Sequence, residues 1–441
     1  MARVADITRR QFLKTSAAFL AVTAIGRPLS AAPSRPPNVV VIVADDLGYG
    51  DVGCYGCPDI PTPHIDALAA GGTRFAQGYV GSPICSPSRA CILTGRLPAR
   101  IHWECNPAGW AQDVGLPQRE LTIANCLMHR GYVTGCIGKW HLGSGDGFLP
   151  RQRGFDYFYG FCGAERAYVQ RRSLAEVLYR NEEPVDDPGT YLTDAFAGEA
   201  VDFIRQNADR PFFLYFAPNA VHGPFEAPQA YLDRARARAN PNRWVYAAMT
   251  IALDDAVGRV LAEVNRQGLA AGTLVFFVSD NGPNLEYEPR HGSPGPFKGG
   301  KGWLYEGGIR VPFIATWPGT IPAGVTCDTP AITADILPTI LDATHARAAT
   351  KLDGVSLLKP PPDRLLVWRI TGLDRDGRGE ALRQGKWKFI ARVRRPHELY
   401  DIEADPAEST NLAPRESGRA NEMARALAAQ WQAMGAAPTS R

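Results

Sequence analysis

The chain has 441 residues, of which 45% are hydrophobic and 21% are charged, and its formal net charge is +3. This length and composition allow a large buried core in one or two domains and exclude a disordered chain. The small net charge and the nine cysteines argue against a nucleic-acid-binding protein and against a small disulfide-stabilised domain.

Lysine is rare in this chain, because only eight of its 48 basic residues are lysines. Between residues 15 and 350 the lysines are Lys139, Lys298 and Lys301. Where arginine is the default, a lysine can mark a place that needs a compact ammonium group. Codon usage is the alternative explanation.

Residues 1–32 have the pattern of an export signal. The pair Arg9-Arg10 precedes a short apolar run, Ala17–Ile25, and small residues follow up to Ala32. This segment resembles a twin-arginine signal peptide, which implies recognition by the twin-arginine translocase and a periplasmic or extracellular location. The run is too short to span a bilayer and no later segment reaches eighteen apolar residues, so we expect no stable membrane span.

The next segments alternate between predicted strands and predicted helices. Apolar, β-branched runs predict buried strands, and amphipathic stretches with polar starts and glycine ends predict helices. Strands are predicted at Asn38–Ala44, Pro211–Phe216, Leu274–Ser279 and Val311–Trp317, and helices at Thr62–Gly72, Leu121–His129, Tyr191–Asn207, Trp244–Gln267 and Asp335–Thr344.

This alternation predicts an α/β fold with a large, mostly parallel central sheet covered by helices on both faces. We assign residues 37–359 to this catalytic domain. After Pro360-Pro361-Pro362 the pattern changes to short strand-like pieces at Leu365–Ile370, Ala381–Ile390 and Glu398–Ile402, and then to a helix at Arg419–Met434. Residues 363–435 are therefore predicted to form a small C-terminal α+β subdomain with a short antiparallel sheet and a terminal helix.

Two of the predicted strands end in acidic or amide residues. Asp45 and Asp46 follow the first strand, and Asp280 and Asn281 follow the strand that ends at Ser279. Each pair alone could be a helix cap or a turn. Two such pairs at the ends of parallel strands would bring four oxygen ligands together, which suits Ca²⁺ or Mg²⁺ better than zinc.

A cysteine-containing segment is the second candidate site. Cys85 precedes Ser86-Pro87 at a predicted helix start, and Arg89 lies one turn further along the same helix face. A helix N-terminus favours an anionic side chain, so Cys85 could be a nucleophile. A buried structural cysteine is the equally weighted alternative at this point.

A longer set of motifs resembles the formylglycine-dependent (type I) sulfatases of the alkaline phosphatase-like superfamily, including exported bacterial members similar to arylsulfatases and N-acetylgalactosamine-6-sulfatases. The resemblance runs from about Pro37 to Asn411 and covers nearly the whole mature chain. The stretches that carry it are Pro37–Asp51, Cys85-x-Pro87-x-Arg89 with Leu93–Arg96, Gly138–Gly143, Ser279–Gly282 and Gly300–Gly308.

This resemblance implies a specific cofactor chemistry. In the family a separate formylglycine-generating enzyme oxidises the cysteine that matches Cys85 to Cα-formylglycine (3-oxoalanine), which reacts as an aldehyde hydrate. One hydroxyl of the hydrate attacks sulfur and the second then expels sulfate, so water need not attack the sulfur directly. The implied activity is hydrolysis of a sulfate ester to an alcohol and inorganic sulfate.

The resemblance also implies roles for individual residues. The set implied to hold one divalent cation, Ca²⁺ by preference and Mg²⁺ as the alternative, is Asp45, Asp46, Cys85, Asp280 and Asn281. Arg89 is implied to hold the hydrate, and Lys139 and Lys301 to neutralise the sulfate oxygens. His141 is implied to act as a base, and His222 to donate a proton or hydrogen bond to the leaving group.

Other candidates remain outside this assignment. Lys298 is interpreted as a loop or substrate-edge residue, and a solvated loop role is favoured for His64, His102 and His291. Cys54 and Cys57 have no second cysteine pair with which to bind zinc. The basic residues at 234–238 are interpreted as a solvated helix face, with contact to an anionic glycan as the alternative.

The predicted substrate is a sulfated sugar or an aryl sulfate ester, with a sulfated glycan preferred for an exported enzyme. Two alternatives stay open from the sequence. One is a phosphate or phosphonate monoester hydrolase on the same scaffold, and the other is a glycan-binding relative that never receives the aldehyde.

Overall fold

The apolar run at residues 38–44 forms strand β1 (Asn38–Ala44), and all seven of its residues are buried. Alternate side chains of β1 enter two cores, since Val40 packs on one face of the sheet and Val41 on the other. The computed structural model describes residues 35–107, 114–171, 173, 176–287, 291–361, 363–371 and 378–436. The predicted signal segment, residues 1–32, lies outside the described residues.

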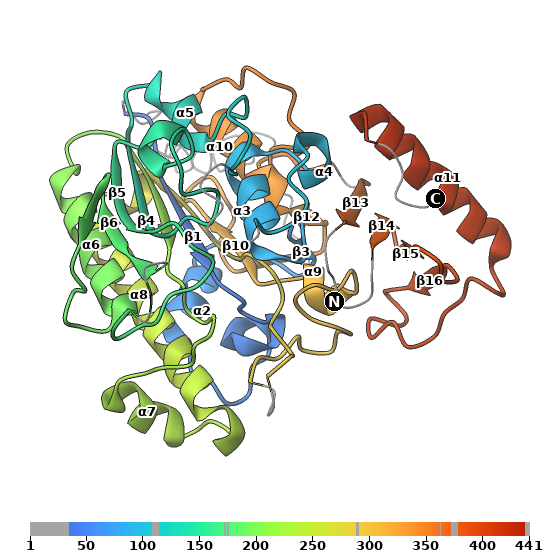
Figure 1. Ribbon diagram of the computed structural model, residues 1–441, viewed down its shortest axis with the longest axis horizontal. Helices are drawn as coiled ribbons and strands as arrows, with labels where there is room; N and C mark the ends of the chain where they lie inside the picture. Colours follow the sequence, from blue (N-terminus) through green and yellow to red (C-terminus); the bar gives the residue numbers. More distant parts are fainter. Residues whose placement is uncertain are drawn as a thin grey trace, which may run out of the picture. The chain divides into compact units, whose positions relative to one another are not determined.

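Strand β1 lies near the middle of a ten-stranded sheet with the order β11-β2-β10-β9-β1-β8-β4-β5-β6-β7 (Figure 1). The strands β9, β1, β8, β4 and β5 run parallel to one another, β10 is antiparallel to β9, and β6 is antiparallel to β5. The other strands are β2 (Thr73–Phe75), β4 (Val133–Lys139), β5 (Tyr157–Phe161), β6 (Leu178–Arg180), β7 (Glu183–Val185), β8 (Phe212–Ala217), β9 (Thr273–Ser279), β10 (Phe313–Thr316) and β11 (Val325–Cys327). The predicted fold class is confirmed.

Helices cover both faces of this sheet, as Figure 1 shows. One core contains side chains of α2 (Pro63–Ala70), α6 (Leu192–Gln206) and α8 (Trp244–Arg266). The opposite core contains side chains of α3 (Cys85–Thr94), α5 (Ile123–Met128) and α10 (Ile336–Thr344). Other helices in this part of the described chain are α4 (Pro98–Ile101), α7 (Gln229–Arg236) and α9 (Glu306–Ile309).

Strand β4 is the central strand that the sequence analysis did not predict. It contains two glycines, which weaken a strand pattern. Both are required by close packing: a side chain at Gly135 would meet the ring of Phe203, and one at Gly138 would meet the carbonyl oxygen of Ala217. The residues that let β4 pack between its neighbours therefore also hide it from a search for apolar alternation.

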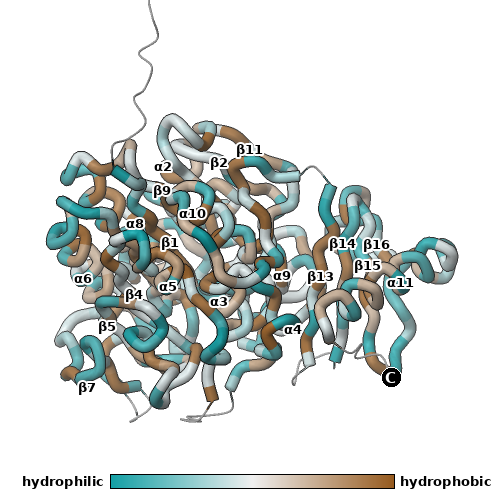
Figure 2. Tube along the Cα trace, turned by 90° about the horizontal axis from the view of Figure 1, so that it is seen from above, coloured by the Kyte–Doolittle hydropathy of each residue, from teal (hydrophilic) through white to brown (hydrophobic). Residues whose placement is uncertain are grey.

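The C-terminal part of the chain forms a separate antiparallel sheet with the order β13-β14-β15-β16. Its strands are β13 (Leu365–Ile370), β14 (Gly379–Gln384), β15 (Trp387–Arg392) and β16 (Glu398–Asp401), and helix α11 (Ser417–Met434) packs against β14 and β15 (Figure 2). The piece predicted at Ala381–Ile390 is two strands, because Gly385 turns the chain with a φ of 56°. We call residues 365–434 the C-terminal region.

A third hydrophobic core joins the C-terminal region to the rest of the fold. It contains Trp368 and Phe389 together with Tyr79 and Leu304, and the indole of Trp368 donates to the carbonyl of Val80. The described residues from Pro37 onward form one compact unit, and the division into domains at residues 359–363 stays a prediction. Within the described part of the chain, no helix is both long and apolar enough to cross a bilayer.

Candidate active site

The carboxyl ends of β1 and β9 bring the two predicted acidic pairs together. Ala44 is paired with Ser279, and the backbone N–H of Asp280 donates to the carbonyl of Ala44 at 3.0 Å. The N–H of Asp46 in turn donates to Oδ1 of Asp280 at 3.1 Å. Because the strands are parallel neighbours, residues more than 230 positions apart meet at one edge of the sheet.

Two buried cations pair with Asp45 and Asp280. The ammonium of Lys139, the last residue of β4, lies 2.6 Å from Oδ2 of Asp45. Arg89 donates from Nε to Oδ2 of Asp280 at 2.9 Å and lies 3.5 Å from Oδ1 of Asp45. All four side chains are fully buried, so these charges interact in a water-poor environment.

Burial and neighbouring charges shift the pKa values of Asp45 and Asp280 in opposite directions. Burial alone would raise the pKa of Asp45, but Lys139, together with His222 and Arg89, holds that pKa below its usual value. The pKa of Asp280 is raised by burial and by the negative charge of Asp45.

Asp46 has its own set of partners. Its carboxylate lies 2.7 Å from the ammonium of Lys301, accepts from Nδ2 of Asn281 at 2.7 Å, and lies 3.7 Å from Nε2 of His222. Burial would raise the pKa of Asp46, but Lys301 and His222 lower it below its usual value. The pKa of Lys301 is raised well above its usual value, because Asp46 outweighs the cost of burying the ammonium.

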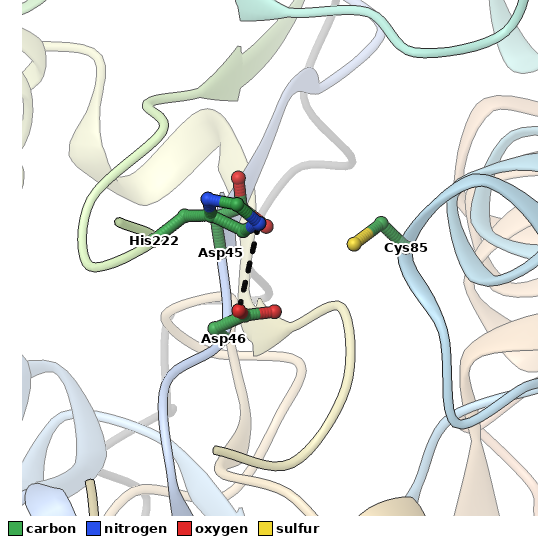
Figure 3. Close-up of side chains that lie close together, drawn as sticks. All are labelled: Asp45, Asp46, Cys85 and His222. Atoms are coloured by element: carbon green, nitrogen blue, oxygen red, sulfur yellow. Dashed lines mark ion pairs between the residues drawn. The ribbon is translucent and has the colours of Figure 1, made fainter. Parts of the chain in front are cut away.

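Cys85 faces these groups from the first turn of α3. Its Sγ and ligand atoms of Asp45, Asp46 and His222 all lie within 4.8 Å of one another, and Figure 3 shows the sulfur pointing toward the two aspartates. The side chain is nearly inaccessible, with 1% of the residue exposed. Burial raises the pKa of the Cys85 thiol to about 11, although Lys139 and Lys301 oppose the shift. An unmodified Cys85 is therefore a protonated thiol at neutral pH.

His141 follows β4 by two residues and is 3% exposed. Its carbonyl accepts from the hydroxyl of Ser86, the residue after Cys85, at 2.6 Å, which holds the two segments together. Burial and the charges of Lys139 and Arg89 lower the pKa of His141 well below its usual value. The neutral ring has no hydrogen bond to its Nδ1 and can accept a proton.

The donor set tests whether a metal ion fits this site. Oδ1 of Asp45 and Oδ1 of Asn281 are buried and accept no hydrogen bond from the described part of the chain, which is costly unless another group binds them. They belong to a set dominated by oxygen, which suits a hard cation such as Ca²⁺ or Mg²⁺. The residues present therefore fit the divalent cation that the sequence predicts.

All the residues predicted for the site lie in this part of the fold, and the other candidates lie apart from it. His64 lies in the first turn of α2 and its backbone N–H donates to Asp254, His102 caps the end of α4, and His291 packs its ring against Phe225. The ammonium of Lys298 contacts the C-terminal region at the carbonyl of Glu408. The roles of the site residues stay predictions.

The basic segment at residues 234–238 is largely paired within the protein. Arg234 forms an ion pair with Asp255, and Arg236 lies over the ring of Trp244. Cys54 and Cys57 do not form a disulfide, and the thiol of Cys57 donates to Asp59 at 3.5 Å. Neither feature contributes to the site.

The sequence analysis missed residues that support the site without joining its chemistry. Ser86 accepts from the indole of Trp103 at 2.8 Å while it holds His141, and the hydroxyl of Ser279 accepts from the N–H of Leu47 at 3.0 Å. Serine and tryptophan carry no sequence pattern that marks such roles. Only the contacts between distant segments show them.

Comparisons with known proteins agree with this geometry. The sequence matches the family "Sulfatase" over residues 37–346. The chain is 36% identical to human (Homo sapiens) arylsulfatase A, over 90% of this chain and 87% of that protein. It is also 36% identical to N-acetylgalactosamine-6-sulfatase of Sus scrofa, over 85% of this chain and 70% of that protein.

The fold is also similar to solved structures. The crystal structure of Ps i-CgsB in complex with k-i-k-neocarrahexaose superposes with a TM-score of 0.85 and 32% sequence identity, over 92% of this chain and 95% of that chain. The match of the family, the identity to arylsulfatase A and the alkaline phosphatase-like fold lead to one conclusion. The chain belongs to the sulfatase family and is a sulfatase, a sulfuric ester hydrolase.

Proposed function

We propose that this sulfatase hydrolyses a sulfate ester on a glycan, and that Cys85, converted to formylglycine, carries the nucleophile. The observation that carries the proposal is the placement of Cys85 within 4.8 Å of ligand atoms of Asp45, Asp46 and His222 at the strand ends. The sulfatase family generally uses a metal ion and formylglycine. The hydrate of formylglycine supplies one hydroxyl for attack on sulfur and a second for release of sulfate.

The metal ligands we propose are Asp45, Asp46, Asp280, Asn281 and the modified Cys85. Asp45 and Asn281 each contribute a buried oxygen that accepts no hydrogen bond from the described residues. A bound Ca²⁺ would act there as a Lewis acid and hold a sulfate oxygen in place. Arg89 holds two of the carboxylates in position, because its planar guanidinium reaches Asp45 and Asp280 together.

The remaining residues provide positive charge and proton transfer. Lys139 and Lys301 place ammonium groups beside the metal-site carboxylates, where they can stabilise the charge that develops on the sulfate oxygens. His141 is held neutral by its surroundings and accepts a proton as sulfate leaves. His222, whose side chain is 11% exposed, lies at the edge of the site and donates to the leaving oxygen.

A carbohydrate substrate is supported by a structural neighbour that has a bound ligand. Ps i-CgsB, 32% identical to this chain, was solved in complex with k-i-k-neocarrahexaose. We therefore prefer a sulfated glycan to a simple aryl sulfate as the natural substrate. Aryl sulfates serve as convenient probes of the same bond.

The decisive experiment combines mass spectrometry with kinetics on protein from the native host. The Cys85 peptide should carry formylglycine, and the enzyme should hydrolyse an aryl sulfate faster than the matching aryl phosphate. Cys85→Ser should abolish turnover, while the exposed Cys105→Ser should retain it. An unmodified thiol in active protein, or faster turnover of the phosphate, would overturn the proposal.

We also propose that residues 1–32 are a twin-arginine export signal and that a formylglycine-generating enzyme acts on the chain before export. The arginine pair Arg9-Arg10 supports the first proposal. N-terminal sequencing of the exported protein should find a start near Ala32, and replacing both arginines with lysine should retain the protein in the cytoplasm. Normal export of that variant would contradict the assignment.

A further inference from the structure

We call residues 298–306 the lysine loop. Its ends contact the C-terminal region, and its middle places Lys301 at the strand ends. Two backbone hydrogen bonds fix its middle: the N–H of Lys301 donates to the carbonyl of Pro283 at 2.9 Å, and the N–H of Gly302 donates to the carbonyl of Pro83 at 2.8 Å. These contacts connect the loop to the segment after Asn281 and to the segment before Cys85. The two ends of the loop are also joined, because the N–H of Gly307 donates to the carbonyl of Lys298 at 2.8 Å. The position of the Lys301 ammonium is therefore set by contacts at the middle of the loop and at its ends.

Both ends of the loop are held by one residue of the C-terminal region, Glu408. Its carbonyl accepts from the ammonium of Lys298 at 3.2 Å, at the start of the loop. Its carboxylate accepts from the backbone N–H of Glu306 at 2.6 Å, at the end of the loop. Glu408 is fully buried and lies between β16 and α11.

Further contacts fix the two ends. The ammonium of Lys298 lies 4.0 Å from the ring centroid of Tyr305 and 5.6 Å from that of Tyr400, within the range of cation–π attraction. At the other end, the buried ammonium of Lys388 lies 3.0 Å from the carboxylate of Glu306 and 2.9 Å from that of Glu408. We call Glu306, Lys388 and Glu408 the Lys388 triad.

We propose that Glu408 and Lys298 are positioning residues for Lys301, so that the C-terminal region sets the place of this ammonium beside the candidate metal site. The proposal rests on the proposed role of Lys301 in binding the sulfate oxygens. Neither residue contacts the strand-end groups in the structure. They act through the loop, whose two ends they hold against the C-terminal region.

The physical reason is that lysine is a flexible side chain and its charge acts only where its backbone places it. Lys301 Nζ lies 2.7 and 2.9 Å from the two carboxylate oxygens of Asp46. A loop that is released at one end would let this ammonium move by an ångström or more. A shift of that size at a catalytic group can cost on the order of 100-fold in rate.

The test uses pairs of variants that differ in whether the contact can be remade. Lys298→Ala removes the donor to Glu408, and Lys298→Arg restores both a donor and a cation over Tyr305. Glu408→Ala removes the acceptor for the N–H of Glu306, and Glu408→Gln keeps an acceptor oxygen. The exposed residues Lys351 and Glu403, changed to alanine, are matched controls.

We expect Lys298→Ala and Glu408→Ala to lower kcat/KM for an aryl sulfate at least tenfold, with most of the loss in kcat. Lys298→Arg and Glu408→Gln should recover most of it, and both controls should equal the wild type. Melting temperatures checked in parallel identify any variant that fails to fold. Equal kinetics for the alanine variants and the wild type would overturn the proposal.

A double-mutant cycle separates positioning from a general effect. In a Lys301→Ala background there is no ammonium left to position, so adding Lys298→Ala should change kcat/KM less than twofold. A loss as large as that in the wild-type background would show that Lys298 acts independently of Lys301 and would contradict the proposal.

Hydrogen exchange provides a readout that does not depend on activity. Peptides covering residues 298–308 should exchange faster in Lys298→Ala and Glu408→Ala than in the wild type and the two controls. Unchanged exchange in these peptides would refute the loop tether. Faster exchange in a protein whose wild type hydrolyses no sulfate ester would leave the tether intact and refute the proposed function instead.

Discussion

The short segment from Lys301 to Glu306 has a buried charge cluster at each end, and each cluster contains both acidic and basic side chains. At one end is the strand-end cluster, which contains Asp45, Asp46, Asp280, Arg89, Lys139 and Lys301. At the other end is the Lys388 triad. In the triad, one ammonium lies within 3.0 Å of both carboxylates, and Glu306 is also paired with Arg310 at 3.3 Å.

The strand-end cluster differs because it leaves donor atoms open. Asp45 Oδ1 and Asn281 Oδ1 have no hydrogen bond, and Arg89 approaches Asp45 Oδ1 only to 3.5 Å. The distance to a cation distinguishes the two groups. Glu408 Oε1, which also makes no hydrogen bond among the described residues, lies 2.9 Å from the ammonium of Lys388, whereas Asp45 Oδ1 lies 3.5 Å from Arg89. A buried charge cluster with open ligand atoms suits an incoming ion, whereas one that is closed by its own residues suits a structural tether.

The largest effect should be on stability and should come from removing the ammonium of the Lys388 triad. Lys388→Met removes the cation that two buried carboxylates share, and leaving buried charges unpaired costs about 3–5 kcal/mol. We expect the free energy of unfolding in urea to fall by that amount, with a smaller change in kcat per folded molecule than Lys301 variants show. The exposed substitution Lys351→Met is the control, and unchanged stability of Lys388→Met would contradict the assignment.

The next largest effect is on turnover and tests the shape of a cation in the strand-end cluster. Lys301→Arg replaces a compact ammonium with a larger, flatter group next to Asp46 and should lower kcat about 100-fold, which corresponds to ~2.7 kcal/mol, with little change in melting temperature. Lys139→Arg should also cut turnover sharply. Near-normal turnover in both variants would mean that codon usage, and not a need for ammonium groups at the site, explains why lysine is rare in this chain.

Calcium should distinguish the two groups directly. A ligand present at about ten times its Kd stabilises the folded state by about 1.4 kcal/mol, so chelation should lower the melting temperature and Ca²⁺ should restore it. Asp45→Asn should abolish this response, while Lys388→Met should retain it at a lower melting temperature. A calcium response that survives in Asp45→Asn would place the ion elsewhere.

The smallest effect is a pH dependence of stability that arises in the triad. Burial, opposed by Lys388 and reinforced by the negative charge of Glu306, raises the pKa of Glu408 to about 7. The folded protein therefore holds a proton that the unfolded chain releases, so this contribution is complete below about pH 4.5 and is lost as the pH rises through 7. We expect the free energy of unfolding to fall by about 1 kcal/mol between pH 6 and 7.5, measured by urea unfolding at each pH.

Glu408→Gln removes the titrating group and should flatten this pH dependence. The exposed substitution Glu403→Gln should leave it unchanged. If the slope in Glu408→Gln equals that of the wild type, another group must account for it.

The same contrast explains how much could be predicted from the sequence. The strand-end residues were found because their position is local: Asp45 and Asp280 each follow a continuous apolar strand, and parallel strands end at one edge. Lys139 lies at the end of a strand hidden by glycines and was assigned only through the family resemblance. Burial and ion pairing in the folded protein then gave each of these residues a physical context.

The triad could not be predicted in this way. Glu306, Lys388 and Glu408 lie in three segments with no shared pattern, and a lone lysine or glutamate in a sequence is more often exposed. Their burial results from the packing of the C-terminal sheet against Tyr79 and Leu304, which is a tertiary property. The same holds for Lys298, whose partner Glu408 follows it by 110 residues.

The burial of Cys85 also has a consequence for timing during synthesis. A residue that is 1% exposed at the start of a buried helix is out of reach of another enzyme once the surrounding fold has formed. At ribosomal rates of about 5–20 residues per second, roughly 10–40 s pass between synthesis of Cys85 and of Lys301. Oxidation of Cys85 must occur in that interval or in a chain kept from folding. A chain that folds before it is oxidised would keep a buried thiol at the position where the proposed mechanism needs an aldehyde.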